Sequence, residues 1–134
     1  MHDLQAVVVS SVQQLKSSND DSEGAFHNLI EVDHAVVPYL ISAFQTETDD
    51  AIRAVLVEII WQHRQPETEK FLLEALEDSS PKVWKNALDG LVTLGSPEVA
   101  TKLESIRKRV ATKWPDRICW IDEALGQITE SLKS

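Results

Sequence analysis

The sequence predicts an all-α protein, and two observations carry this prediction. The chain has only four glycines in 134 residues, fewer than the tight turns of a sheet protein of this size usually need. Apolar residues also recur at helical spacing along the chain, and proline, glycine and helix-capping residues interrupt them at short intervals. We therefore expect about eight helices arranged in four antiparallel pairs.

Capping residues mark the helices of the first half. Asp20 followed by Glu23 is a capping-box pattern, with aspartate in the capping role. Asp33 and Asp49 stand where they can cap two further helices. The last of the four helices is apolar on nearly all sides, which is typical of a helix packed from both sides. The expected helices cover residues 3–17, 20–31, 33–45 and 50–63.

Proline opens the helices of the second half. Pro66 starts one helix, and the Ser-Pro pairs at 80–81 and 96–97 each combine an N-cap with proline at the first helical position. Gly95 fits a left-handed C-cap between them. The last helix starts at Trp114-Pro115, and we expect its buried stripe to hold Ile118, Ile121, Leu125, Ile128 and Leu132.

Two consecutive helix pairs repeat one another. Residues 40–44 (LISAF) align with residues 72–76 (LLEAL) at an offset of 32. The second helices align at an offset of 31, with Ile52, Leu56 and Ile60 against Val83, Ala87 and Leu91. A period of about 31 residues indicates stacked helix pairs.

Residues 35–97 thereby resemble the HEAT-repeat family, in particular the short bacterial repeats related to phycobilisome lyases. The shared pattern is a leading proline with leucines, an acidic turn, then Ile52-Arg53 in one repeat and Val83 in the next. Trp84 departs from it, standing where the family usually has arginine. The resemblance implies one domain over residues 1–134, a short right-handed α-α superhelix with atypical ends. Its repeats would cover residues 3–32, 33–65, 66–95 and 96–134; a non-repetitive helical bundle is the alternative.

The charge distribution is uneven. The net charge is −9, and residues 1–80 carry a net −11 while residues 81–134 carry +2. An acidic surface attracts basic proteins and repels nucleic acid and anionic lipid, so we expect a basic protein partner, no membrane binding and no nucleic acid. The exception is one basic stretch, interpreted as a solvated face or as a contact with a second copy: Lys102, Arg107, Lys108, Arg109, Lys113 and Arg117.

Motifs that carry chemistry are missing from the sequence. Residues 19–24 look like the start of an EF-hand loop, but its twelfth position is Ile30 where a bidentate glutamate is needed. His27 and Glu31 share a helix face without a metal-ligand partner. Cys119 is expected to be packed within its helix. We therefore expect no enzyme, no catalytic residue, no metal and no cofactor.

The second helix of each pair would form the concave binding surface of a solenoid. On these helices Trp61 is expected in the core, whereas Trp84 and Trp120 fit either core or interface. The candidate partner-binding residues are Asp49, Asp50, Arg53, Glu58, Trp84, Lys85, Asp89, Trp120, Asp122 and Glu123.

The sequence is consistent with several functions. Size and acidity favour a small inhibitor or immunity protein that neutralises a basic toxin, acting as a monomer or weak homodimer. The phycobilisome lyase-type resemblance implies instead an accessory, maturation or scaffold factor, and a self-associating module is a third reading. A nucleic-acid-binding HEAT-like protein is disfavoured by the acidic surface. A single cysteine and the lack of a signal peptide predict a cytoplasmic protein.

Overall fold

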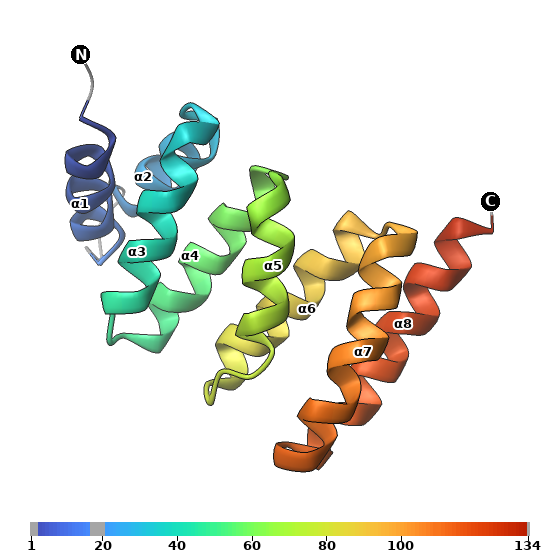
Figure 1. Cartoon of the computed structure of the whole chain (residues 1–134). Coiled ribbons are helices and arrows are strands. Elements are labelled where there is room, and N and C mark those ends of the chain that lie inside the picture. The colour runs from blue at the N-terminus through green and yellow to red at the C-terminus, as the bar shows by residue number, and fades with distance from the viewer. Residues whose placement is uncertain (1–2, 17–20, 134) are drawn as a thin grey trace. The chain divides into compact units, whose positions relative to one another are not determined.

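The computed structural model describes residues 3–16 and 21–133, and these residues are all-α (Figure 1). They form two compact units, unit 1 within Met1–Thr68 and unit 2 within Glu69–Ser134. No strand occurs among the described residues, as the sequence predicts. None of the helices described is long and apolar enough to cross a membrane.

Unit 1 holds the first four α-helices and a short 3-10 helix, η1 (His34–Val36). Helix α1 packs on α2 and α3 packs on α4, while α1 also contacts α3 and α2 contacts α4. First helices therefore stack on first helices and second on second, which is the arrangement of a helical repeat. The α-helices are α1 (Leu4–Leu15), α2 (Asp21–Glu31), α3 (Val37–Thr46) and α4 (Asp50–Gln62).

Helix α4 is buried on more than one side, as its composition predicts. Its buried residues are Ile52, Ala54, Leu56, Val57, Ile59 and Ile60. Asp49 caps it by accepting hydrogen bonds from the backbone N–H groups of Ala51 and Ile52. Trp61, expected in the core, is only partly buried. The Asp20 of the expected capping box and part of the EF-hand-like segment lie outside the described residues.

Unit 2 holds most of α5, which spans the boundary between the units, and the remaining helices. Helix α7 packs on α8, and α8 also packs on α6. The helices are α5 (Pro66–Ala75), α6 (Pro81–Leu94), α7 (Pro97–Lys113), the 3-10 helix η2 (Pro115–Arg117) and α8 (Ile118–Leu132). The prolines that were expected to open α5, α6 and α7 are their first residues.

The caps of unit 2 differ in detail from the sequence prediction. Ser96 caps α7 with its side chain, which accepts from the Val99 N–H at 3.1 Å. Ser80 occupies the cap position of α6 but makes no side-chain cap hydrogen bond; its own N–H instead donates to the Asp78 carboxylate. Gly95 ends α6 in the left-handed conformation with φ +42°, as predicted.

Three predictions of burial in unit 2 were wrong. Leu132 is 44% exposed because it lies in the last turn of α8. Cys119 is exposed, since its position on α8 turns it away from the buried face carried by Ile121 and Ala124. Arg117, expected on a solvated basic face, is only 4% exposed.

Candidate functional site

The second helices of unit 2, α6 and α8, bring five of the ten predicted binding residues together. Trp84, Lys85 and, one turn later, Asp89 lie on α6, and Trp120 and Glu123 lie on α8. Trp84 is buried, with 7% of its surface exposed, whereas Trp120 is 44% exposed. The sequence left open whether these two tryptophans are core or interface residues. Trp84 lies in the core and Trp120 lies at the surface.

Trp120 is held in place by a series of contacts between tryptophan rings and cationic side chains. The Arg117 guanidinium lies 4.0 Å from the Trp114 ring centroid and 4.8 Å from that of Trp84. The Trp84 ring meets the Trp120 ring edge-on at 5.7 Å, and the Lys85 ammonium lies 4.4 Å from the Trp120 centroid. Because cations favour the π-face of tryptophan, each group in this series restrains its neighbours. We use the name ladder for Trp114, Arg117, Trp84, Trp120 and Lys85.

Arg117 anchors the ladder to the backbone. Its Nη1 donates a 2.6 Å hydrogen bond to the carbonyl oxygen of Leu76, which follows the end of α5. Burial lowers the pKa of Arg117, and the charges of Asp78 and Asp116 oppose that change. This role was not predicted from the sequence, because a single arginine within a basic stretch looks like a solvated residue. The signal that could have found it is the tryptophan three residues earlier at the same helix start.

Beside Trp120 lies a hollow of about 130 Å³ between α6 and α8. Two carboxylates, those of Asp89 and Glu123, belong to its wall, and neither has an ion-pair partner among the described residues. Burial raises the pKa of Asp89 above its usual value of 3.8. We call this site the α6–α8 hollow; its lining is Leu88, Asp89, Val92, Trp120, Glu123, Ala124 and Gln127.

Asp122, predicted alongside Glu123, takes part in a different contact. Its carboxylate accepts two hydrogen bonds from Arg107 of α7, at 2.6 Å from Nε and 2.9 Å from Nη2. This bidentate pair lowers the pKa of Asp122, with burial opposing the hydrogen bond. Asp122 is therefore engaged with α7, whereas Glu123 lines the α6–α8 hollow.

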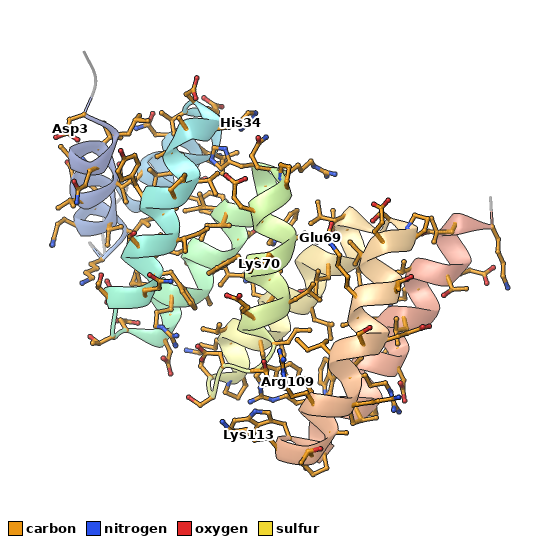
Figure 2. All side chains as sticks on the ribbon, in the orientation of Figure 1. Asp3, His34, Glu69, Lys70, Arg109 and Lys113 are labelled. Carbon is orange, nitrogen blue, oxygen red and sulfur yellow. The ribbon has the colours of Figure 1, made fainter. Side chains whose placement is uncertain are left out.

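The basic stretch of α7 is largely neutralised within unit 2. Besides Arg107, the Lys102 ammonium lies 2.8 Å from a Glu69 carboxylate oxygen, and Arg109 makes two hydrogen bonds to Glu77 at 2.8 and 2.9 Å (Figure 2). These acids come from α5 and the turn that follows it. The stretch is therefore not a continuous positive face of the kind that nucleic-acid binding requires.

In unit 1 the predicted acids have local structural partners. Asp49 is the cap of α4, and Asp50 lies 3.4 Å from Arg53 on the next turn. The Arg53 guanidinium also lies 4.5 Å from the Phe44 ring centroid. Glu58 is partly buried within α4.

Two larger hollows lie in unit 1. One, of about 550 Å³, is lined by Leu4, Val7 and Val32 with Asn28 and Asp33. Asp33 is already engaged, since its carboxylate accepts from the Ala35 N–H at the start of η1. The other, of about 290 Å³ between α1 and α3, includes the Lys16–Glu47 ion pair. Among the described residues, neither lining includes two carboxylates without an ion-pair partner, as the lining of the α6–α8 hollow does.

Two histidines far apart in sequence meet in unit 1. His63 is 2% exposed, its Nε2 lies 2.8 Å from the Leu29 carbonyl oxygen, and its Nδ1 lies 2.9 Å from Nδ1 of His34. In the neutral tautomer of His63 whose Nε2–H donates to the carbonyl, Nδ1 of His63 accepts from His34. No group of three or more metal-ligating side chains occurs among the described residues.

Comparison with known proteins identifies the repeat. The family described as HEAT repeats matches residues 37–113, which is more than half of the chain. Searches of curated proteins and of solved structures gave no significant match. HEAT repeats are commonly protein-interaction modules. The match covers the two repeats found by internal alignment and extends through α7, and the chain accordingly belongs to the HEAT-repeat family.

Proposed function

We propose that this protein is a non-catalytic binding module that holds a partner protein on the α6–α8 face of unit 2. The observation that carries the proposal is Trp120, a large aromatic side chain 44% exposed yet held by Trp84 and Lys85 beside a hollow. Exposed, rigidly held tryptophans are typical anchors of protein interfaces. A solenoid of helix pairs also uses its second helices for binding.

The size of the α6–α8 hollow favours a protein partner over a small-molecule ligand. Sites for small molecules and cofactors have volumes of about 300–1,000 Å³. The hollow is about 130 Å³, which suits one side chain of a larger partner. The partner is expected to be basic, because the chain carries a net charge of −9.

In its most specific form, the proposal is that the protein is a small inhibitor, such as an immunity protein, of a basic toxin. Its support is the chain's small size, its net charge of −9 and its membership of a family of interaction modules. An inhibitor of this kind acts by occupying a basic surface, and it needs no catalytic group. It would work as a monomer or as a weak homodimer.

Partner capture with matched variants tests the proposal. The tagged chain, its Trp120→Ala variant and its Tyr39→Ala variant would each be used to isolate partners from the source cell. Tyr39 is a fair control because it is 40% exposed and lies on α3 of unit 1. The purified partner should bind Trp120→Ala about 30-fold more weakly, as for an interface hot spot, and Tyr39→Ala normally. Equal affinity of both variants would refute the use of this face.

A further inference from the structure

The α6–α8 hollow combines features that select one kind of side chain. Its wall includes apolar groups of Leu88, Val92 and Ala124, and its polar groups include the carboxylates of Asp89 and Glu123. Lysine and arginine carry a cationic head on an apolar stem, so they can use both parts of such a wall. A wholly apolar side chain would leave two carboxylates beside it, and an anionic one would be repelled.

The electrostatic environment of Asp89 also favours a cationic side chain in the hollow. Burial raises the pKa of Asp89, and no cation of the described residues lies close enough to form an ion pair with it. Lys85, one turn earlier on α6, is directed to the tryptophans and does not line the hollow. A cation brought by a partner would therefore supply an interaction that Asp89 lacks within the fold.

Arginine fits the hollow better than lysine. A guanidinium donates in a planar fork, so it can bond to two carboxylates, and it stacks on an aromatic face. The hollow offers two carboxylates and Trp120 on one surface. The ladder already contains this geometry, since Arg117 stacks between Trp114 and Trp84.

We propose that the α6–α8 hollow is the receptor for a single arginine side chain of the partner protein, with Asp89 and Glu123 binding the guanidinium and Trp120 forming the aromatic wall. This inference rests on the proposed function and adds the chemistry of the partner's anchoring residue. It requires no identified partner for its test, because a short arginine peptide presents the same group.

The probe is the acetylated, amidated tripeptide Gly-Arg-Gly, compared with its citrulline counterpart, which has the same shape without the charge. The full-length protein would be labelled with ¹⁵N and the indole N–H signal of Trp120 followed by NMR, with Trp120→Phe providing the assignment. We expect a saturable shift with the arginine peptide and none with the citrulline peptide. An equal shift with both peptides, or no saturable shift with arginine, would overturn the inference.

Charge-matched variants exclude a nonspecific effect of acidity. Asp89→Asn with Glu123→Gln removes two charges from the hollow, and Glu98→Gln with Glu104→Gln removes two from the exposed surface of α7. The first pair should weaken arginine-peptide binding about tenfold or more, and the second should change it less than twofold. Equal weakening by the two pairs would reject the hollow as the site. The dispersion of the NMR spectrum reports whether each variant is folded.

The arginine-peptide experiment and the partner-binding experiment can fail independently of each other. If Trp120→Ala abolishes partner binding while the arginine peptide fails to bind, the α6–α8 face is the interface and the arginine assignment is wrong. If the arginine peptide binds as expected while Trp120→Ala leaves partner affinity unchanged, the hollow accepts arginine but the proposed interface is refuted.

Discussion

Arg117 shows how a charged residue can stabilise a helical repeat from within. Its guanidinium is sandwiched between Trp114 and Trp84 and satisfies the Leu76 carbonyl, which lies beyond the last turn of α5. Removing the donor leaves a buried carbonyl without this partner, and that costs more than the hydrogen bond itself contributes.

Substitution of Arg117 should therefore be strongly destabilising. We expect Arg117→Met, which keeps the bulk of the stem, to lower the free energy of unfolding by about 2–3 kcal/mol. Urea unfolding followed by circular dichroism measures this change. The control is Lys108→Ala, an exposed change on α7 that should stay within about 0.5 kcal/mol. A loss at Arg117 no larger than that of the control would contradict the role given to the ladder.

Asp89 should behave as a residue kept for binding at the expense of stability. Because burial raises its pKa in the folded state, the folded protein holds the proton more tightly than the unfolded chain does. Stability contributed by this group is therefore present below the usual pKa of 3.8 and is lost as the pH rises through the raised value.

Asp89→Asn should accordingly stabilise the protein at pH 7, by no more than about 0.5 kcal/mol because solvent screens an exposed group. The gain should shrink at pH 4. Asp122→Asn is the matched control with the opposite sign, since Arg107 lowers the pKa of Asp122 and its stabilisation is present above pH 3.8. Urea unfolding at the two pH values checks both. Destabilisation by Asp89→Asn at pH 7 would mean that Asp89 already has a stabilising partner in the fold.

At the scale of residues, the sequence predicted candidate binding residues but not the direction in which each side chain points. Trp84, Lys85, Asp89, Trp120 and Glu123 lie on the second helices α6 and α8 of unit 2. Periodicity could not determine the rotation of α8 about its axis, which turns Asp122 toward Arg107 and leaves Glu123 at the hollow. It also could not pair His34 with His63, because contacts between residues 29 apart depend on tertiary packing.

At the scale of elements, the residues that start and end helices account for the close agreement between predicted and observed helices. Proline lacks an N–H and fixes φ, so it is compatible with a first turn and marks the starts of α5, α6 and α7. Gly95 marks the end of α6 for the complementary reason. The 3-10 turns η1 and η2 were not predicted, because they differ from the start of an α-helix only in hydrogen-bond register.

Two glycines of unit 2 should respond to alanine in opposite directions. At Gly95 the backbone is left-handed, and an added Cβ would lie 2.9 Å from the Val92 carbonyl oxygen. Gly126 lies within α8, where an added Cβ meets nothing within 4 Å. Gly95→Ala should therefore cost about 1–2 kcal/mol, and Gly126→Ala should add up to about 1 kcal/mol. Thermal and urea unfolding of the two variants measure these changes. If both substitutions changed the free energy of unfolding in the same direction, this account of α6 and α8 would be contradicted.

For the whole molecule, membership of the HEAT-repeat family supports the proposed role as a protein-binding module. The repeat places side chains on the surface formed by the second helices. Substitutions on this surface alter it without changing the fold. Acidic residues are concentrated in unit 1, with eleven acids against three bases in residues 1–68 and eleven against ten in residues 69–134. Unit 2, which carries Trp120, is thus nearly neutral, and unit 1 would supply most of the long-range attraction for the proposed basic partner.

The most direct test of the central claim is site-specific photo-crosslinking in the source cell. A benzophenone amino acid replaces Gln127, which lines the α6–α8 hollow, or Lys108, which is exposed on α7. Binding on the α6–α8 face predicts a crosslinked protein adduct from position 127 that disappears when Trp120→Ala is added, and no such adduct from position 108. An adduct from position 108 alone, or one from position 127 that survives Trp120→Ala, would contradict it.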